Sequence, residues 1–386
     1  MTKQKRITKY YIVAGEASGD MHAANLIAEL KSREPNAEFR AWGGDLMQKQ
    51  GVELVRHYRT MAYMGFVEVA VNLRKVLNNI DLCKKDIMEW QPDAIILVDY
   101  PGFNLRIAKF AHEKGFKVFY YVSPQVWAWK RGRVKKIKAS VDRMLVIFPF
   151  EEEFYTRYGV EVTYVGNPLL DELGKFGSGN RSIFLRRNHL GEKREIIALL
   201  PGSRKQEVKR MLPEMLKLAP HFSEYQIVVA GVPSLGEEFY RKMIGKSDVF
   251  LVMNQTYELL QCASAAVVTS GTATLETALF SVPEVVCYKA NLFSYLIARW
   301  LIKVKYISLV NLVMEKEVVK ELIQSDMTEK NIKAELVEIL HDSKRQRELL
   351  EDYEDLKDRL GNAGASAKAA NVIHDELKNE ERNRPN

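Results

Sequence analysis

The segment Ile196-Ile-Ala-Leu-Leu-Pro-Gly-Ser-Arg204 joins a continuous apolar run to a Pro-Gly turn, followed by a charged helical pattern. A short run that is apolar at every position is typical of a strand covered on both faces of a parallel sheet. The turn residues then end the strand and open a helix. The segment therefore predicts a strand–turn–helix unit of an α/β fold.

This unit recurs along the chain in two series, separated by a Gly- and Pro-containing segment at Val165–Asp171. Two successive series predict two Rossmann-like, doubly wound α/β domains. A length of 386 residues is sufficient for two such domains. We expect strands at 10–14, 38–42, 94–98, 117–122 and 144–147 in the first series, and at 196–200, 226–230, 265–269 and 285–288 in the second.

Domain limits follow from composition. The polar stretch Gly174–Arg187 follows the boundary segment, and residues 328–378 have a helical pattern rich in Glu, Lys and Leu. The last residues are polar without an apolar face. We expect an N-terminal domain over 1–168, a C-terminal domain over 169–345, helices over 346–378 that pack back on the N-terminal domain, and a disordered tail over 379–386.

Charge and cysteine content restrict the class of protein. The net charge of +7 fits a nucleic acid, an anionic lipid or a phosphorylated ligand as partner. Cys83, Cys262 and Cys287 are far apart, which favours a reducing cytoplasm over a disulfide scaffold and offers no zinc-ligand spacing. No run reaches the roughly 18 apolar residues of a membrane span. We expect a soluble or peripheral protein without a metal site.

Two loops of the first series follow expected strands, where α/β enzymes keep their sites. In Gly15-Glu-Ala-Ser-Gly-Asp20 the glycines allow a tight turn, and the N–H groups beyond it could hold a phosphate. The alternative is a plain turn in which Ser18 or Asp20 caps the next helix. In Asp99-Tyr-Pro-Gly-Phe-Asn104, Asp99 is placed to act as a general base, with a helix cap as the alternative.

The Pro-Gly-Ser-Arg turn of the second series is a stronger signal. Its strand, tight turn and helix N-terminus form an anion site, to which Arg204 adds a forked donor for phosphate. An arginine inside such a turn has little structural purpose. We assign Gly202, Ser203, Arg204 and, one turn later, Glu207 to donor binding, with Arg204 as the residue that holds the phosphate.

The segment Thr269-Ser-Gly-Thr-Ala-Thr-Leu-Glu276 repeats this arrangement. The N–H groups of Ser270, Gly271 and Thr272 suit a diphosphate, and Glu276 could accept hydrogen bonds from ribose hydroxyls. The alternative is a capped helix whose dipole favours an early glutamate. Two such loops in one domain predict a nucleotide-diphosphate site in which helix dipoles and Arg204 act in place of Mg²⁺.

Three amphipathic segments, 64–77, 123–138 and 293–307, combine aromatic or aliphatic residues with Lys and Arg. Each is compatible with ordinary core packing, and the basic residues over 130–138 also fit RNA. Together they suggest contact with an anionic membrane surface. The residues expected to face the membrane are Phe66, Val69, Leu73, Trp129, Arg131 and Arg133.

The motifs together resemble the lipid-A-disaccharide synthase family. The resemblance runs in order from the first strand to near residue 325. It is carried by GEASGD (15–20), WGGDLM (42–47), MGFVEV (64–69), PDAIILVDYPGFN (92–104), YYVSPQVWAWKRGRVKKI (120–137), FPFEEEFY (148–155), LLPGSRKQEV (199–208), TSGTATLE (269–276) and SLVNLV (308–313).

The resemblance implies a glycosyltransferase of the B-type fold, in which two Rossmann-like domains face a cleft. The implied enzyme is inverting and metal-independent, without a cofactor. Its implied substrates are UDP-2,3-diacylglucosamine and 2,3-diacylglucosamine 1-phosphate, joined through the 6-hydroxyl of the acceptor to give a β-1,6-linked disaccharide 1-phosphate of lipid A biosynthesis and UDP. The implied location is cytoplasmic, peripheral to the inner leaflet of a bacterial inner membrane, with no nucleic acid as partner and a homodimer left open.

The resemblance also implies roles for matched residues. Asp99 is the expected general base and Glu16 the next candidate, while Arg204 stabilises the leaving diphosphate. Asn311 is expected to line the donor pocket. The expected acceptor-binding residues are Ser18, Gly19, Gln125 and Trp127.

Two positions depart from the family pattern: Asn167 replaces an expected His, and Val310 an expected Pro. Two other functions stay open on the sequence. One is a UDP-sugar 2-epimerase-like enzyme of the same architecture. The other is a non-catalytic binder of anionic membrane or nucleic acid, which would leave the two anion-binding loops unexplained.

Overall fold

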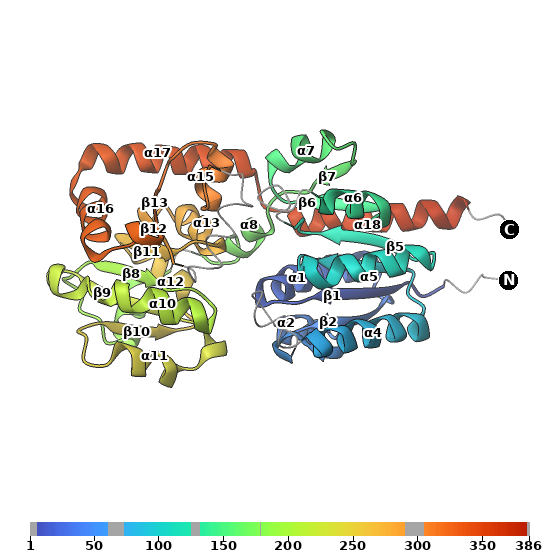
Figure 1. Cartoon of the computed structure of the whole chain (residues 1–386), viewed down its shortest axis with the longest axis horizontal. Helices are drawn as coiled ribbons and strands as arrows, with labels where there is room; N and C mark the ends of the chain where they lie inside the picture. Colours follow the sequence, from blue (N-terminus) through green and yellow to red (C-terminus); the bar gives the residue numbers. More distant parts are fainter. Residues whose placement is uncertain (1–5, 61–72, 125–131, 178, 290–304, 384–386) are drawn as a thin grey trace. The chain divides into compact units, whose positions relative to one another are not determined.

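The computed structural model describes residues 6–60, 73–124, 132–177, 179–289 and 305–383. The chain forms two compact units (Figure 1). The first comprises Met1–Asp171 together with Asn362–Asn386, and the second comprises Glu172–Gly361. The chain therefore passes between the units twice.

The first unit contains a parallel sheet with the strand order β3-β2-β1-β4-β5-β6-β7. Its central strands are fully buried, because helices cover both faces. The strands are β1 (Lys9–Ala14), β2 (Glu38–Gly43), β3 (Glu53–His57), β4 (Ala94–Val98), β5 (Lys117–Tyr121), β6 (Arg143–Val146) and β7 (Val162–Tyr164).

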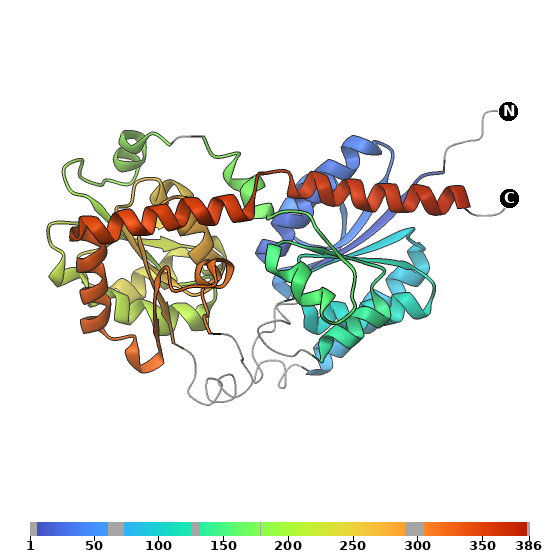
Figure 2. The same ribbon diagram turned by 90° about the horizontal axis from the view of Figure 1, so that it is seen from above.

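Alternate residues of these strands separate the two helical layers. Tyr11, Val13 and Leu97 face a core shared with α4, α5 and α6. The opposite face carries α1 and α18, which lie side by side in Figure 2. The helices are α1 (Ala17–Arg33), α2 (Asp45–Lys49), α4 (Leu73–Trp90), α5 (Pro101–Glu113), α6 (Arg133–Ser140), α7 (Pro149–Thr156), α8 (Pro168–Leu173) and α18 (Ala365–Asn383).

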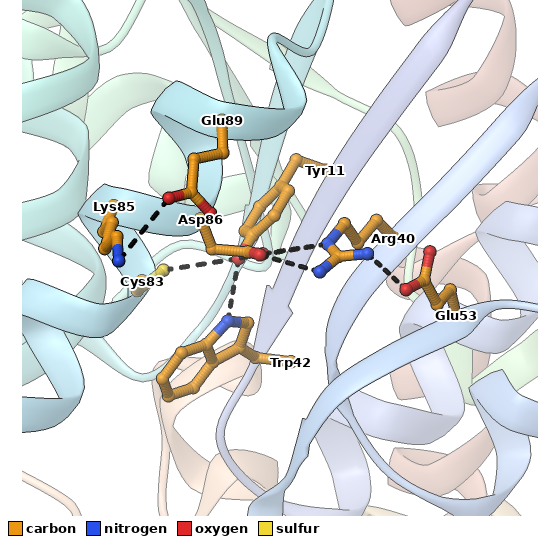
Figure 3. Close-up of polar contacts among 8 residues, drawn as sticks. All are labelled: Tyr11, Arg40, Trp42, Glu53, Cys83, Lys85, Asp86 and Glu89. Atoms are coloured by element: carbon orange, nitrogen blue, oxygen red, sulfur yellow. Dashed lines mark hydrogen bonds and ion pairs between the residues drawn. The ribbon is translucent and has the colours of Figure 1, made fainter.

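A buried network of hydrogen bonds connects α4 to the sheet (Figure 3). The Asp86 carboxylate on α4 accepts hydrogen bonds from the Tyr11 hydroxyl at 2.7 Å and from Nη2 of Arg40 at 2.7 Å. Trp42 Nε1 in turn donates to the Tyr11 hydroxyl at 2.8 Å. Burial raises the pKa of Tyr11, so its hydroxyl stays protonated and keeps both contacts. The network fixes α4 on β1 and β2.

The second unit contains a parallel sheet with the order β10-β9-β8-β11-β12-β13. Helices again cover both faces, with α10, α11 and α16 on one core and α9, α12 and α13 on the other. The strands are β8 (Ile196–Leu200), β9 (Gln226–Gly231), β10 (Phe250–Met253), β11 (Ala265–Thr269), β12 (Glu284–Tyr288) and β13 (Lys320–Ile323). The helices are α9 (Arg181–Arg187), α10 (Lys205–Leu216), α11 (Glu237–Ile244), α12 (Thr256–Leu260), α13 (Thr272–Leu279), α15 (Leu309–Met314), α16 (Glu329–His341) and α17 (Ser343–Leu360).

The prediction of two Rossmann-like domains is confirmed. In each sheet the order of the strands reverses at one place, between β1 and β4 in the first unit and between β8 and β11 in the second. Open α/β sheets bind ligands beyond the carboxyl ends of the strands at such a switch point. These two places therefore locate the candidate sites.

The C-terminal helices differ from expectation. Only α18 belongs to the first unit, whereas α17 packs within the second through Leu349, Tyr353 and Leu356, all fully buried. The expectation that all of 346–378 packs on the N-terminal domain is therefore wrong for the α17 part. The expected disordered tail is also wrong over 379–383, which extend α18.

The Asp171 carboxylate caps α18. It accepts hydrogen bonds from the main-chain nitrogens of Gly364 at 2.5 Å, Ala365 at 3.1 Å and Ser366 at 2.8 Å. Three N–H groups that would otherwise lack partners at a helix start are thus satisfied by one side chain. Asp171 is the last residue of the first segment of the first unit, and its side chain thus holds the start of the second segment.

No helix within the described ranges is long and apolar enough to cross a membrane. Over the same ranges, no group of three or more His, Cys, Asp and Glu side chains is arranged to hold a metal ion.

Candidate active site

The two candidate loops of the first unit adjoin at its switch point. β1 and β4 are paired, with Ala14 opposite Val98, so residues 15–20 and 99–104 leave the same edge of the sheet. A Cβ atom on Gly15 would lie only 2.3 Å from Cγ of Tyr100. Glycine is thus required at position 15 for the two loops to pack together.

The edge around Asp99 has a strained backbone. Asp99 and Tyr100 have φ angles of 44° and 48°, and Val122, directly after the neighbouring β5, has a φ of 62°. Left-handed conformations are uncommon outside glycine, and for a β-branched residue they are outliers. Such strain persists only where the surroundings enforce it, and it concentrates at functional sites. The predicted general base therefore lies in a segment with a strained backbone.

Two buried side chains hold the main chain of Asp99. The carbonyl oxygen of Asp99 accepts hydrogen bonds from Nδ2 of Asn104 at 2.8 Å and from the Tyr120 hydroxyl at 2.5 Å. The sequence did not mark either residue as functional. Tyr120 lies within an apolar strand pattern, and Asn104 ends the DYPGFN motif without a chemical reason that the sequence alone supplies.

The other acceptor-side candidates of the first unit fall close to this edge. Glu16 is the half-buried N-cap residue of α1, and Ser18 is half-buried in the first turn of that helix. Gly19 is buried, and a Cβ there would meet Cβ of Ala14 at 3.3 Å. Gln125 and Trp127 lie outside the described residues.

The Asp20 side chain caps a different helix from α1, the helix expected from the sequence. Its carboxylate is 2% exposed and accepts hydrogen bonds from the main-chain nitrogens of Gly44 at 2.7 Å, Leu46 at 3.0 Å and Met47 at 3.2 Å. The side chain therefore caps α2. It ties the GEASGD loop after β1 to the WGGDLM loop after β2.

Most of the residues expected to face the membrane lie outside the described part of the chain. Phe66, Val69, Trp129 and Arg131 lie outside the described residues, as does the side chain of Leu73, the first residue of α4.

Arg133 can be placed. It is half-buried at the start of α6, and its charge acts on the Tyr120 hydroxyl beside Asp99. Burial lowers the pKa of the Arg133 guanidinium. Arg133 therefore lies near the Asp99 edge, and its contact with a membrane stays a prediction.

The Pro-Gly-Ser-Arg turn lies at the switch point of the second unit. β8 and β11 are paired there, with Leu200 opposite Val268. Gly202 has a φ of 106°, and a Cβ on it would lie 2.8 Å from Oε2 of Glu207. Ser203 and Arg204 are exposed beyond the strand end. The turn thus presents a cation next to the N-terminus of α10.

Glu207 acts on Arg204. Its carboxylate accepts hydrogen bonds from the main-chain nitrogen of Arg204 at 3.3 Å and from Nη1 of the same residue at 3.0 Å. This orients the guanidinium at the helix start. The structure thus gives Glu207 a positioning role that the assignment to donor binding did not foresee.

The Ser-Gly-Thr loop follows β11 at the same edge. The Ser270 main-chain nitrogen donates to the carbonyl oxygen of Cys287 at 2.9 Å, and its hydroxyl donates to that of Ile307 at 3.0 Å. Ser270 therefore fixes the loop. Gly271 and Thr272 are exposed at the N-terminus of α13, next to the Pro-Gly-Ser-Arg turn. Their N–H groups lie at a helix start, the kind of place where proteins bind anions.

Glu276 lies one turn into α13 and is half-buried. Burial raises the pKa of its carboxyl group to about 7, although the Tyr257 hydroxyl, which donates to Oε1 at 3.4 Å, opposes the shift. A carboxyl group that is partly desolvated gains from further hydrogen-bond donors. Its environment is thus suited to accepting hydrogen bonds from a polyol.

The side chain of Asn311, predicted to line the donor pocket, makes four hydrogen bonds within the protein. It is fully buried, and its Oδ1 accepts from the main-chain nitrogens of Val318 at 2.8 Å and Val319 at 2.9 Å. Its Nδ2 donates to the carbonyl oxygen of Val319 and to Oε1 of Glu321, both at 2.9 Å. These four bonds use the full capacity of an amide, so none remains for a ligand.

The departure at Asn167 also has a structural explanation. The side chain is 3% exposed, and Oδ1 accepts from the main-chain nitrogen of Leu169 at 3.0 Å. Asn167 thus satisfies an N–H group at the start of α8. This is a helix-capping role.

The sequence of the chain matches a family model described as lipid-A-disaccharide synthetase over residues 10–374. The chain is 45% identical to the lipid-A-disaccharide synthase of Syntrophus aciditrophicus over 366 residues, which cover 93% of this chain and 95% of the relative. It is 40% identical to that of Myxococcus xanthus over 379 residues, covering 97% and 98%.

Solved structures of other enzymes share the fold. A UDP-GlcNAc 2-epimerase from Neisseria meningitidis bound to UDP-GlcNAc has a TM-score of 0.68 at 12% identity, covering 96% of this chain and all of that one. The glycotransferase of kitacinnamycin has a TM-score of 0.62 at 16% identity, with the same coverage. At these identities the likeness concerns the fold alone, whereas the sequence match spans both units and every loop described above. The chain belongs to the lipid-A-disaccharide synthetase family.

Proposed function

We propose that this protein transfers a 2,3-diacylglucosaminyl group from its UDP derivative to the 6-hydroxyl of 2,3-diacylglucosamine 1-phosphate. The products are a β-1,6-linked disaccharide 1-phosphate and UDP. The observation that carries the proposal is the pair of anion-binding loops at the β8–β11 switch point of a chain from this family. This is the place where a nucleoside diphosphate is expected in an open α/β sheet.

We assign the leaving group to the second unit. The guanidinium of Arg204 and the N–H groups of Gly271 and Thr272 would receive the diphosphate charge as the bond from the anomeric carbon to the phosphate oxygen breaks. Glu276 would accept hydrogen bonds from the ribose hydroxyls. Because the helix starts and Arg204 are already in place, little reorganisation would accompany the charge development.

We assign the base to the first unit. As the acceptor oxygen attacks the anomeric carbon from the face opposite the diphosphate, its proton passes to the carboxylate of Asp99. The bond from the acceptor oxygen to the anomeric carbon forms as the bond from that carbon to the diphosphate oxygen breaks, so the anomeric centre inverts. The strained backbone at Asp99 supports this choice over Glu16.

A mass-spectrometric assay tests the reaction. Purified protein is incubated with UDP-2,3-diacylglucosamine and 2,3-diacylglucosamine 1-phosphate, and the disaccharide 1-phosphate and UDP are expected in equal amounts. A parallel reaction with deacylated UDP-glucosamine is expected to be far slower. Conversion of a soluble UDP-sugar to its 2-epimer, without disaccharide, would instead indicate an epimerase.

We also propose that the enzyme works at the inner leaflet of the inner membrane, where diacylated sugars reside. The support is α6, which buries Val134 and Ile137 while Lys135, Lys136 and Lys138 are exposed. Each exposed lysine near an anionic surface adds ~1 kcal/mol of binding free energy.

Sedimentation with vesicles of phosphatidylglycerol and phosphatidylethanolamine tests this proposal. Reversing the charges of the three α6 lysines is expected to reduce binding. Reversal of Lys209, Lys242 and Lys246, exposed in the second unit, serves as the matched control. Equal losses in both triple variants would show only a general effect of net charge.

A further inference from the structure

We propose that Asn104 and Tyr120 are positioning residues for the transfer, because together they hold the main chain of Asp99 in the left-handed conformation that sets its carboxylate. The inference rests on the proposed function, in which Asp99 is the base. It adds two residues whose effect reaches the reaction only through Asp99.

Asn104 joins three main-chain carbonyls at the switch point. Its Nδ2 lies 2.8 Å from the carbonyl oxygen of Asp99, 3.2 Å from that of Val98 and 3.3 Å from that of Val13. These oxygens belong to the ends of β1 and β4 and to the first residue beyond β4. The amide therefore sets the end of β4 against β1 at the point where Asp99 begins.

The orientation of this amide is determined by its surroundings. Asn104 is fully buried, and its Oδ1 has no hydrogen-bond partner among the described residues. If the amide were rotated by a half turn, Oδ1 would face the three carbonyl oxygens, which would repel it. The fold thus accepts one buried acceptor without a partner, which is costly, in order to keep Nδ2 on the strand ends.

Tyr120 holds the same carbonyl from the neighbouring strand. Its hydroxyl, carried by β5, donates to the carbonyl oxygen of Asp99 at 2.5 Å. Burial, with the negative charge of Asp99 adding to it, raises the pKa of Tyr120 well above its ordinary value. The hydroxyl therefore remains a donor throughout the working pH range.

The strain at Asp99 explains why two donors are needed. Consecutive left-handed residues other than glycine relax unless other contacts hold them. Asn104 and Tyr120 both bind the carbonyl that follows the Asp99 Cα, so they fix the ψ angle of this residue. Loss of either contact lets the carboxylate move away from its position, and a displacement of about 1 Å costs on the order of 100-fold in rate.

Adjacent tyrosines provide the matched comparison. Tyr120→Phe removes the hydroxyl that reaches Asp99, whereas Tyr121→Phe removes that of an equally buried neighbour on the opposite face, near Ser366. For Tyr120→Phe we expect kcat to fall roughly 10- to 100-fold with UDP affinity unchanged. Tyr121→Phe is expected to keep the wild-type kcat.

A double-mutant cycle separates positioning from folding. If Tyr120 acts through the Asp99 carboxylate, Tyr120→Phe lowers kcat in the wild-type background and has no further effect in an Asp99→Ala background. Asn104→Ser is expected to show the same non-additivity. A loss of equal size in both backgrounds, or wild-type kcat for Tyr120→Phe, would overturn the inference.

The cycle also distinguishes failure of this inference from failure of the proposed function. Disaccharide formation by the wild-type enzyme tests the function alone. If that product forms and Asp99→Ala lowers kcat, while Tyr120→Phe behaves like Tyr121→Phe, the function stands and the positioning role does not.

Discussion

The carboxylate of Glu207 binds both the main-chain nitrogen and the guanidinium of Arg204, at 3.3 and 3.0 Å, on the first turn of α10. An exposed arginine loses considerable side-chain entropy when it binds an anion. A partner that orients it beforehand reduces that loss. The pair therefore links the shape of the Pro-Gly-Ser-Arg turn to affinity for a diphosphate.

Substitution of Arg204 tests this link. Arg204→Gln removes a charge-assisted contact worth about 1.5–3 kcal/mol, so the Kd for UDP is expected to rise roughly 10- to 100-fold. Glu207→Gln is expected to have a smaller effect in the same direction. Isothermal titration with UDP measures both, and Lys209→Gln, exposed on the same helix, is the control.

Glu276 predicts a pH dependence of UDP binding. Burial raises its carboxyl pKa to about 7, so in the free protein the neutral form is favoured and its contribution to stability declines as pH rises from about 4.5 through 7. Ribose hydroxyls donate to the ionised form. UDP affinity is therefore expected to fall as pH drops below about 7.

The Glu276→Gln variant isolates this effect. A terminal phosphate also titrates near pH 6, so wild type and variant both respond to pH, and the difference between them reports Glu276. We expect the variant to bind UDP more weakly at pH 8 and to approach the wild type at pH 5.5. Parallel titration curves would contradict the assignment.

Asp99→Ala is expected to lower kcat by about 100- to 10,000-fold, the usual contribution of general base catalysis, because the acceptor proton then has no positioned base. UDP affinity should stay within twofold, since the residues assigned to UDP belong to the other unit. Single-turnover kinetics with equilibrium UDP binding measures both. Activity near the wild-type level would show that another group takes the proton.

Asp171 caps α18 and is not assigned to the reaction, so its loss is expected to lower stability alone. Asp171→Ala leaves three N–H groups at the start of α18 without their acceptor, so we expect a loss of about 0.5–2 kcal/mol in the free energy of unfolding. Urea denaturation measures it. Asp375→Ala, exposed on the same helix, is the control.

The strands that could be predicted were the central ones. The expected ranges 94–98, 196–200 and 265–269 coincide with β4, β8 and β11, each buried at every position. Full burial produces the continuous apolar run that marks a parallel strand. The candidate loops were found for the same reason, since they follow these strands.

The edge strands β3, β7, β10 and β13 were missed. The residues of β3, β7 and β13 are mostly half-buried, so charged and polar side chains such as Arg56, Thr163 and Glu321 interrupt the apolar pattern. By contrast, β10 is a continuous apolar run, but it is only four residues long. The strand expected to end at Val122 ends one residue earlier, because Val122 adopts a left-handed conformation that its sequence disfavours.

Side-chain roles were less predictable than loop positions. Asn311 and Asp20 lie in motifs that suggested ligand contact and helix capping of α1. The Oδ1 atom of Asn311 instead accepts from main-chain groups just before β13, and the Asp20 carboxylate accepts from those at the start of α2. Such partners depend on tertiary packing, which no local pattern encodes. The same holds for Tyr120, whose strand position indicates only burial.

The place of α18 in the first unit affects the order in which the chain is made. The second unit is one continuous stretch, Glu172–Gly361, and all of it leaves the ribosome before α18. Domains generally fold as units during synthesis. The N-terminal sheet is translated first, but α18 covers its face beside α1 only after the second unit has been made. A nascent chain stalled near residue 361 would present that apolar face to chaperones.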